Sequence, residues 1–237
     1  NDGENLMRTL VVGDIHGCWD EFQTLLDKAG LSADDQIISV GDMVDRGPDS
    51  PRVLDFFRDT PNARAIMGNH ERKHVRGARG ETTLAPSQVI TGLQFGDAYA
   101  EALDYMTALP LYIELPQADI VHGFFQPGLP LAQQRENVLT GSTSGENALL
   151  KVLEQPWYML YDGEKPLIVG HRNYMGAPFP MVYPKVSSAR VYGLDTGCVY
   201  GGALTGVILP EFRLISVASR GDHWTELQKE YHWTLEN

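Results

Sequence analysis

Three stretches of this sequence decide its fold, and they read Gly13-Asp14-Ile15-His16-Gly17, Gly41-Asp42-Met43-Val44-Asp45-Arg46-Gly47 and Gly68-Asn69-His70-Glu71. Each follows a short run of apolar and β-branched residues, and these runs are Thr9–Val12, Ile37–Val40 and Ala63–Met67. Such runs are typical of buried strands. The glycine after each run allows the backbone to bend sharply without a Cβ penalty. Polar side chains are therefore expected at three successive strand ends.

Two helices are predicted between these strands. The first has apolar residues at helical spacing over Trp19–Ala29 and ends at Gly30. The second is capped by Asp49 or Ser50, with Pro51 in its first turn. Alternating strands and helices imply a parallel sheet with right-handed crossovers. The carboxyl ends of its strands meet at one edge, where sites assemble in open α/β sheets.

The rest of the chain predicts one helical region and further strands. The helical region runs from about Ser87 to Ala108, and a loop-rich stretch covers Gly123 to Gly145. Further strands are expected at Leu111–Leu115, Ile120–Val121, Leu167–Val169, Arg190–Leu194, Ala203–Leu209 and Phe212–Val217, with a tight turn at Pro210–Glu211. Because no repeat or linker is visible, we expect a single domain over residues 1–237.

Composition limits the classes of function. The chain has 237 residues, 43% of them apolar and 21% charged, as in soluble globular proteins. Its formal net charge of −12 argues against non-specific nucleic-acid binding, because an acidic surface repels polyanions. Neither a membrane-spanning run nor a secretory signal is visible, and Met7 fits a natural first residue. Cys18 and Cys198 are expected to be free, inert thiols. A cytoplasmic location is predicted.

The polar residues at the strand ends form a set of potential metal ligands. Carboxylates (Asp14, Asp42), an amide (Asn69) and an imidazole (His16) together suit intermediate divalent ions such as manganese, iron or zinc. Asp14 and His16 are two residues apart, so in an extended chain their side chains face the same way. His70 faces away from its neighbour Asn69 and can address a substrate. A carboxylate three residues past Asp42, that of Asp45, could orient this imidazole.

Together, the three stretches resemble the motifs of metallophosphoesterases of the phosphoprotein phosphatase family, with a calcineurin-like domain. They are most similar to the bacterial branch, which includes symmetrical diadenosine tetraphosphatases and the phosphatase domain of bacterial polynucleotide kinase-phosphatases. The resemblance runs from about residue 8 to residue 218. Its further motifs are Val121-His122-Gly123, Val169-Gly170-His171, Gly193-Leu194-Asp195-Thr196-Gly197-Cys198 and Gly201-Gly202-Ala203-Leu204-Thr205. It implies a two-sheet α/β sandwich with flanking helices and a dinuclear metal site at the carboxyl ends of the strands.

The resemblance also implies a role for each motif residue. The metal ligands would be Asp14 and His16 for the first ion, Asp42 bridging both ions, and Asn69, His122 and His171 for the second. His70, paired with Asp45, would protonate the leaving oxygen, and Arg46 would clamp the phosphoryl oxygens. Two ions can stabilise both the entering and the leaving oxygen of an in-line displacement. Direct attack by metal-bound hydroxide, with no covalent phosphoenzyme, is implied.

Departures from the family pattern leave one role open. Phe124 stands where a second glycine is usual, and Arg172 where a threonine usually follows the last histidine. A second phosphate-clamping arginine normally lies between the last two histidine ligands, and the arginine of that interval, Arg135, has a different context. Residues 141–146 resemble a segment that precedes the missing arginine, which would place Lys151 near it. The second clamp is therefore Arg172, Lys151 or Arg135.

The other chemistry-bearing residues have ordinary interpretations. Asp195 lies in an Asp-Thr-Gly sequence that suits a β-turn, so a structural role is expected. His74, His223 and His232 are interpreted as ordinary surface or core residues.

Three functions remain open. The first is a phosphatase for phosphomonoesters such as phosphoserine and phosphothreonine in proteins, with small phosphate esters as further substrates. The alternative is a dinucleoside polyphosphate hydrolase, and a third reading is a silent relative that binds phosphorylated partners. The intact Asp45–His70 pair argues against the third, since a binding module needs no general acid.

Two divalent ions are expected, manganese first, with iron, zinc, nickel, cobalt or magnesium as alternatives. Substrate choice should depend on the loops Gly123–Gly145 and Arg172–Lys185.

Overall fold

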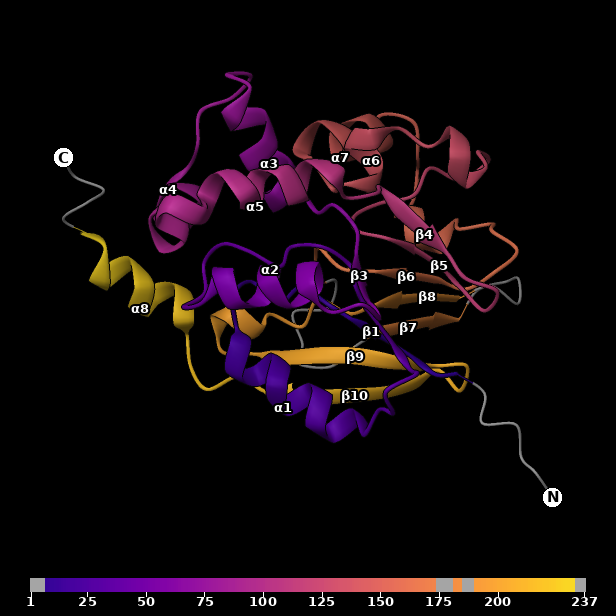
Figure 1. Ribbon diagram of the computed structural model, residues 1–237. Helices are drawn as coiled ribbons and strands as arrows, with labels where there is room; N and C mark the ends of the chain where they lie inside the picture. The colour runs from indigo at the N-terminus through magenta and orange to yellow at the C-terminus, as the bar shows by residue number, and fades with distance from the viewer. Residues whose placement is uncertain (1–6, 174–180, 185–189, 233–237) are drawn as a thin grey trace.

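Two five-stranded sheets face each other, and helices cover their outer sides (Figure 1). A computed structural model describes residues 7–173, 181–184 and 190–232. The first sheet has the order β10 (Arg213–Ala218), β9 (Ala203–Leu209), β1 (Thr9–Val12), β2 (Gln36–Ser39), β3 (Ala63–Ala65). The second has the order β4 (Tyr112–Glu114), β5 (Asp119–Val121), β6 (Leu167–Val169), β8 (Arg190–Gly193), β7 (Met181–Pro184). The predicted two-sheet sandwich is confirmed.

The α-helices of the described residues pack on both sides of this sandwich (Figure 1). Their bounds are α1 (Trp19–Ala29), α2 (Ser50–Asp59), α3 (Asn69–Ala78), α4 (Pro86–Phe95), α5 (Tyr99–Ala108), α6 (Glu136–Leu139), α7 (Thr143–Leu150) and α8 (His223–Glu230). Gly30 ends α1 in the left-handed conformation, with a φ of 58°. Asp49 caps α2 by accepting the N–H of Arg52 at 3.2 Å. None of the described helices is both long and apolar enough to cross a bilayer.

Successive side chains of a strand point to opposite faces of its sheet, and this explains how the apolar cores are divided between the layers of the sandwich. In β1, Leu10 and Val12 belong to the core under the helices, whereas Val11 belongs to the core between the two sheets. In β6, Ile168 faces the core between the sheets, and its neighbours Leu167 and Val169 pack in a third core with residues of α6 and α7. Both faces of the central strand of each sheet are therefore buried, as the apolar runs in the sequence require.

Parallel pairing brings the motif stretches to one edge. β1 pairs in parallel with β2, and β2 pairs in parallel with β3. β5, β6 and β8 are also mutually parallel, so His122, His171 and Asp195 follow strand ends of the second sheet. The polar residues after the strands of both sheets therefore meet at one end of the sandwich.

Several sequence-based boundaries were wrong. The helical region Ser87–Ala108 is two helices, because Gly96 adopts a φ of 53° and opens a 3₁₀ turn between α4 and α5. The loop-rich stretch Gly123–Gly145 contains α6 and the beginning of α7. The helices α3 and α8 had no prediction, and β7 lies within the stretch Arg172–Lys185 that was predicted to be a loop. Part of the predicted loop Arg172–Lys185 lies outside the described residues.

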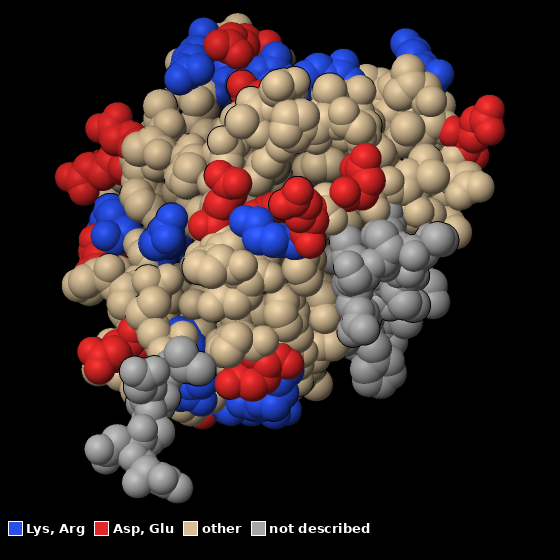
Figure 2. Space-filling view, turned by 90° about the vertical axis from the view of Figure 1, so that its right-hand side faces the viewer, with Lys and Arg blue, Asp and Glu red and all other residues tan. Residues whose placement is uncertain are grey.

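Charged side chains lie intermixed over the surface. Figure 2 shows one face on which acidic and basic residues are neighbours, separated by wide neutral areas. No continuous basic surface appears on this face, in agreement with a chain of net charge −12.

Candidate metal centre and its surroundings

The carboxylate of Asp42, at the end of β2, is the point on which the site converges. Its Oδ2 lies 3.4 Å from His122 Nε2, 3.7 Å from His16 Nε2 and 4.0 Å from His70 Nε2. Its Oδ1 accepts the backbone N–H of His70 at 3.0 Å. Burial opposes ionisation of Asp42, but the imidazoles of His122 and His70 outweigh it and hold its pKa well below the usual range.

A first group of donors forms around Asn69, at the beginning of α3. Asn69 Oδ1 lies 3.0 Å from His122 Nε2 and 2.8 Å from His171 Nδ1. His122 donates its Nδ1–H to the carbonyl of Val40 at 2.9 Å, which directs its Nε2 toward Asn69 and Asp42. Burial alone would lower the pKa of His122, but the Asp42 carboxylate outweighs burial and raises this pKa to about 10.

A second group forms at the end of β1. His16 donates its Nδ1–H to the carbonyl of Val44 at 2.9 Å and directs its Nε2 toward Asp42. Burial, and then the nearby His70, lower the pKa of His16 to about 3, so its Nε2 offers a lone pair. Both carboxylate oxygens of Asp14 lie 3.0 Å from the backbone nitrogen of His171. Burial, and then the carboxylate of Asp195, raise the pKa of Asp14 well above its usual value.

These donors fit divalent metal ions. Carboxylate and amide oxygens and imidazole nitrogens converge here, and a divalent cation can take the place of the protons that these nitrogens share with the oxygens. The groups His16–Asp42–His70 and Asp42–His122–His171 could each hold a metal, with donor atoms within 4.8 Å of one another. Asp42 belongs to both groups, which suits a bridging ligand. Oxygen and nitrogen donors together suit intermediate divalent ions.

Asp45 anchors a second network beside the donors. Its buried carboxylate accepts His70 Nδ1–H at 2.6 Å, His74 Nε2–H at 2.8 Å and the amide of Gln88. Burial opposes the charge, but the hydrogen bonds from His70 and His74 outweigh it and depress the pKa of Asp45. Tyr99 donates to His74 Nδ1 at 2.7 Å. His70 is thereby held in one tautomer, with its Nε2 facing the site.

Two of these residues were missed as members of the site. His74, interpreted from sequence as an ordinary residue, is fully buried and bonded to Asp45. Its spacing of four residues from His70 on one helix was the available signal. Gln88 had no such signal, because it reaches Asp45 from α4, far along the chain.

Glu71 supports the loop that carries Asp42. Its buried carboxylate accepts the backbone N–H groups of Met43 at 2.7 Å, Asp42 at 2.9 Å, Gly68 at 3.0 Å and Val44 at 3.3 Å. Four donors on one side chain tie the loop after β2 to the beginning of α3. The sequence motif contained Glu71 but gave it no role.

The backbone of the site is strained. Six non-glycine residues among those described have positive φ, and the site contributes five, namely His16, Asp42, Asp45, Arg46 and His171. Such conformations cluster at functional sites, where the surroundings enforce them.

Of the three glycines that follow β1, β2 and β3, two are needed for space rather than for bending. Gly41 has a φ of 97°, but Gly13 and Gly68 lie outside the left-handed region. A Cβ on Gly68 would lie 2.2 Å from Asp42 Oδ1, and one on Gly47 would lie 1.8 Å from the carbonyl oxygen of His16. The expected sharp bend therefore explains Gly41. At Gly13 and Gly68 it is close packing that excludes a side chain.

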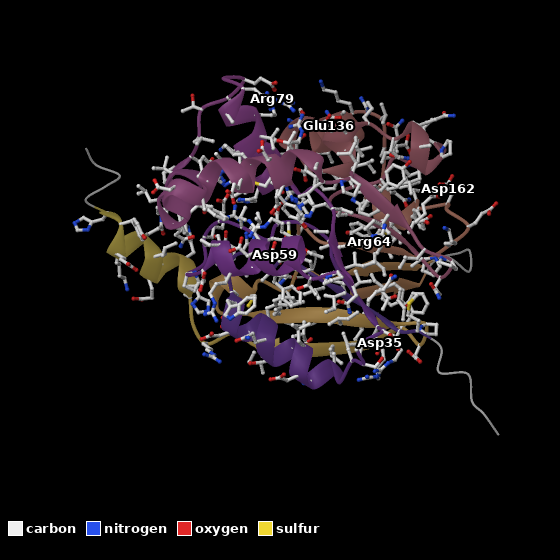
Figure 3. All side chains as sticks on the ribbon, viewed as in Figure 1. Asp35, Asp59, Arg64, Arg79, Glu136 and Asp162 are labelled. Carbon is white, nitrogen blue, oxygen red and sulfur yellow. The ribbon has the colours of Figure 1, made fainter. Side chains whose placement is uncertain are left out.

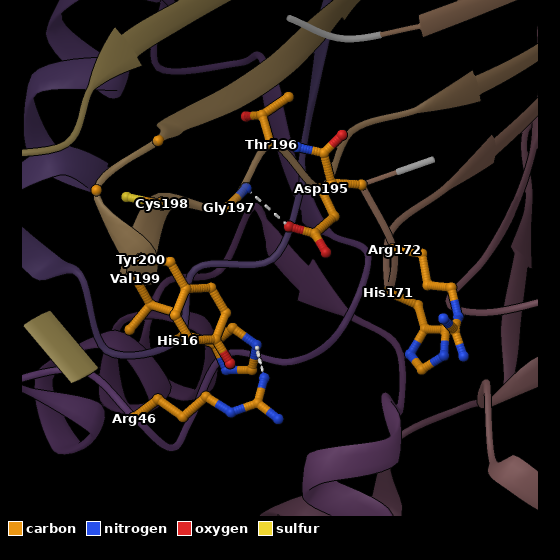
Figure 4. A pocket seen from close by; sticks show the side chains of 13 residues that line it. His16, Arg46, His171, Arg172, Asp195, Thr196, Gly197, Cys198, Val199 and Tyr200 are labelled. Carbon is orange, nitrogen blue, oxygen red and sulfur yellow. Dashed lines mark hydrogen bonds between the residues drawn. The ribbon is translucent and has the colours of Figure 1, made fainter. Parts of the chain in front are cut away.

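A cavity of about 570 Å³ opens beside the donors (Figure 4). Arg46, His16 and Tyr200 lie on one side of it, and His171 lies on the other. Arg46 Nη1 lies 3.2 Å from His16 Nε2, and its guanidinium carbon lies 5.7 Å from the centre of the Tyr200 ring. Tyr200 is 51% exposed, so its ring is available to a ligand.

Asp195 lies between the two sides of this cavity (Figure 4). Its Oδ1 accepts the N–H of Gly197 at 3.0 Å, as the expected turn requires. Burial, and then the carboxylate of Asp42, raise its pKa. The turn residue is therefore also part of the site's electrostatics, which its sequence context did not reveal.

Of the three candidates for the second clamp, Arg172 is the one that lines this cavity. It pairs with Glu146 at 2.5 Å and is half exposed. Lys151 ends α7 on the exposed surface, and Arg135 donates to Gln126 at 3.0 Å. Geometry therefore favours Arg172.

Phe124, which replaces the usual glycine, supports the same side of the site. Its ring meets the ring of His171 edge to face, with centroids 5.1 Å apart. The substitution therefore packs against a metal-ligand candidate rather than opening the site.

Comparison with known proteins identifies the family. The model of the calcineurin-like phosphoesterases matches residues 7–178. The chain belongs to this family. It is therefore a hydrolase, and its family uses divalent metals.

Its curated relatives are bacterial. The chain is 29% identical to the bis(5'-nucleosyl)-tetraphosphatase PrpE [asymmetrical] of Oceanobacillus iheyensis, over 90% of this chain and 93% of the relative. The enzyme of the same name from Bacillus subtilis is also 29% identical, over 88% of this chain and 93% of the relative. Both names state hydrolysis of a dinucleoside tetraphosphate, which was the alternative function above, rather than dephosphorylation of proteins. Both names also specify asymmetrical hydrolysis, whereas the sequence motifs resembled those of symmetrical enzymes.

Solved structures share the fold. A protein proposed to be a diadenosine tetraphosphatase superposes with a TM-score of 0.70 at 24% identity, over 91% of this chain and 95% of that one. A protein serine/threonine phosphatase from Saccharomyces cerevisiae superposes with a TM-score of 0.53 at 15% identity, over 92% of this chain and 81% of that one. The family indicated by the sequence motifs is thus confirmed as the calcineurin-like phosphoesterases, and these solved structures add a likeness of fold.

Proposed function

We propose that this protein hydrolyses dinucleoside tetraphosphates and cuts the phosphate bridge off-centre. The observation that carries the proposal is the convergence of imidazole, amide and carboxylate donors on Asp42, beside a cavity that holds Arg46 and Tyr200. An exposed aromatic ring next to an arginine suits a nucleobase joined to a phosphate, because the base stacks while the guanidinium binds oxygen. The names of the relatives support the same substrate.

In this proposal Asp14, His16 and Asp42 hold one divalent ion, and Asp42, Asn69, His122 and His171 hold the other. When bound, the ions activate a water molecule and polarise the phosphoryl oxygens. Manganese is the ion we expect, in a cytoplasmic enzyme. The remaining chemistry is carried by side chains that are not ligands.

Arg46 binds the oxygens of the phosphoryl group under attack, since its guanidinium lines the cavity beside His16. His70 gives a proton from Nε2 to the leaving oxygen. Asp45 accepts the Nδ1–H of His70 at 2.6 Å and thereby holds the ring with its Nε2 toward the leaving oxygen. Arg172 is the second cation at the cavity and pairs with Glu146 until an anionic substrate competes for it.

The test compares substrates on metal-stripped protein that is reloaded with manganese. Diadenosine tetraphosphate and a phosphothreonine peptide are run side by side, and we expect strong preference for the nucleotide. Preference for the peptide would replace the proposal with a protein phosphatase. Turnover of neither would point to a silent binding protein.

The role of His70 is tested with His70→Asn and the matched surface variant His232→Asn. We expect His70→Asn to lose turnover by a factor on the order of 10² to 10⁴ while still binding manganese. His232→Asn should behave as wild type. Equal activity in His70→Asn would refute the general-acid role.

A further inference from the structure

One face of α3 carries a line of cations that leads away from the donor cluster. Asn69, Arg72, Lys73 and Arg76 are spaced by three, four and seven residues from the first, which places them on one side of the helix. All four line a cavity of about 410 Å³. Since Asn69 begins this helix and contacts His171, the cationic line begins at the site itself.

The opposite wall of this cavity comes from the segment that leads into α7. Gly141, Ser142, Thr143 and Ser144 line it, and α3 and α7 are neighbours in Figure 1. Ser142 caps α7 by accepting the N–H of Gly145 at 3.2 Å, so the positive end of the helix and several hydroxyl groups lie at this wall. Cations on one wall and hydroxyls on the other form a lining suited to an anion.

The local charge is opposite to that of the whole chain. Among the described residues, four cations and one acid line this cavity, although the formal net charge of the chain is −12. The acid is Glu146, which pairs with Arg172 at 2.5 Å. A concentration of positive charge in an acidic protein attracts an anion to one place.

The cations differ in how far they are neutralised. Arg72 pairs with Glu136 of α6 at 2.5 Å (Glu136 is labelled in Figure 3), and Arg76 pairs with Glu81 at 3.1 Å. Lys73 makes no ion pair within the part of the chain that the structure describes, and it is half-buried. Its ammonium group is therefore the charge in this cavity most available to a ligand.

This cavity and the one beside Tyr200 share His171 and Arg172, so they meet at the donor cluster. Their linings differ in character. The cavity beside Tyr200 holds the carboxylate of Asp195 and an exposed aromatic ring, which suit a nucleoside better than a chain of phosphates. A substrate that crosses the cluster therefore meets unlike surroundings on its two sides.

We propose that the cavity between α3 and α7 binds the phosphate chain that remains on the far side of the attacked phosphoryl group, with Lys73 as its main cation. The inference rests on the proposed function. An off-centre cut in a bridge of four phosphates leaves one phosphate on one side and three on the other. Three phosphates need the cationic cavity, and the single nucleoside phosphate lies toward Tyr200. The two cavities thus fix the direction in which the substrate binds and the bond that is cut.

The test replaces Lys73 with methionine, which keeps the aliphatic length and removes the charge. The matched control is Lys151→Met, an exposed lysine that lines neither cavity. For the manganese enzyme, we expect Lys73→Met to raise the KM for diadenosine tetraphosphate about tenfold. Its KM and kcat for p-nitrophenyl phosphate, which has no further phosphates, should change less than twofold. Equal effects on both substrates, or no effect on either, would overturn the proposal.

A second measurement is independent of turnover. Calorimetric titration of metal-stripped protein with inorganic tripolyphosphate should show binding that Lys73→Met weakens about tenfold and that Lys151→Met leaves unchanged. The unfolding midpoint of each variant, measured in parallel, excludes loss of fold, and Lys73→Gln should repeat the result. Binding insensitive to Lys73 would overturn the assignment of this cavity.

The two proposals fail separately. Lys73-dependent tripolyphosphate binding in a protein that does not cut diadenosine tetraphosphate would retain the phosphate-chain cavity and remove the proposed function. Off-centre hydrolysis that does not depend on Lys73 would retain the function and remove the cavity's role.

Discussion

Replacing Asp45 with asparagine separates the positioning of His70 from metal binding. The Asp45 carboxylate is fully buried and accepts hydrogen bonds from His70, His74 and Gln88. An asparagine keeps one oxygen and turns an NH₂ group toward these donors. All three donors then lose the charge of their acceptor and at least one loses its acceptor altogether, so the free energy of unfolding should fall by about 3 kcal/mol. Because His70 also loses its fixed tautomer, kcat should fall by a factor on the order of 10² to 10⁴.

The assay combines urea unfolding of metal-stripped protein with turnover of diadenosine tetraphosphate by the manganese form. Asp49→Asn is the matched control, since it makes the same chemical change at a helix cap where asparagine serves as well. Its unfolding midpoint and kcat should match wild type. If Asp45→Asn also retained the wild-type midpoint and kcat, the account of the Asp45 network would be wrong.

Three further predictions concern stability and metal affinity. Burial opposes ionisation of Glu21, but hydrogen bonds outweigh it and lower its pKa to about 2 from 4.5. The ionised Glu21 therefore contributes about 3 kcal/mol of stability above pH 4.5, and this contribution is lost as pH falls toward 2. Glu21→Gln should remove the pH dependence of the unfolding free energy between pH 2 and 4.5 that this group causes. Glu71→Gln disturbs four backbone hydrogen bonds and should weaken manganese binding about 10- to 100-fold in a calorimetric titration, whereas unchanged affinity would deny Glu71 its supporting role. Gly47→Ala should cost about 3 kcal/mol in urea unfolding because of its clash with a carbonyl oxygen. Gly92→Ala, in a helix where the new Cβ would meet only Tyr99 at 3.9 Å, should stabilise by up to about 1 kcal/mol.

The sequence predicted the part of the fold that local pattern determines. The strands β1 and β6 match their predicted ranges, since each is a continuous apolar run with a clear end. α3 was missed because its first residues are the polar motif Asn69-His70-Glu71, which reads as a turn, and because charged residues dominate its remaining length. The break at Gly96 depends on backbone conformation, which a periodic apolar pattern does not report.

The site residues also fall into those that the local sequence pattern predicted and those that it did not. Sequence motifs named the candidates that the structure gathers around Asp42, because each follows a strand end. Their supports could not be named, since Gln88 and Glu71 act through hydrogen bonds between segments that only folding brings together. The cationic face of α3 became meaningful only with the wall at Ser142 in place, because single lysines and arginines on a helix are ordinary surface residues.

The central claim is that a metal centre built on Asp42 cuts a dinucleoside tetraphosphate off-centre. Its most direct test is chromatography of the products formed from diadenosine tetraphosphate by the manganese-loaded protein, with Asp42→Asn run in parallel. The account predicts equal amounts of AMP and ATP from wild type and no products from the variant. Two molecules of ADP for each substrate, or undiminished hydrolysis by Asp42→Asn, would contradict it.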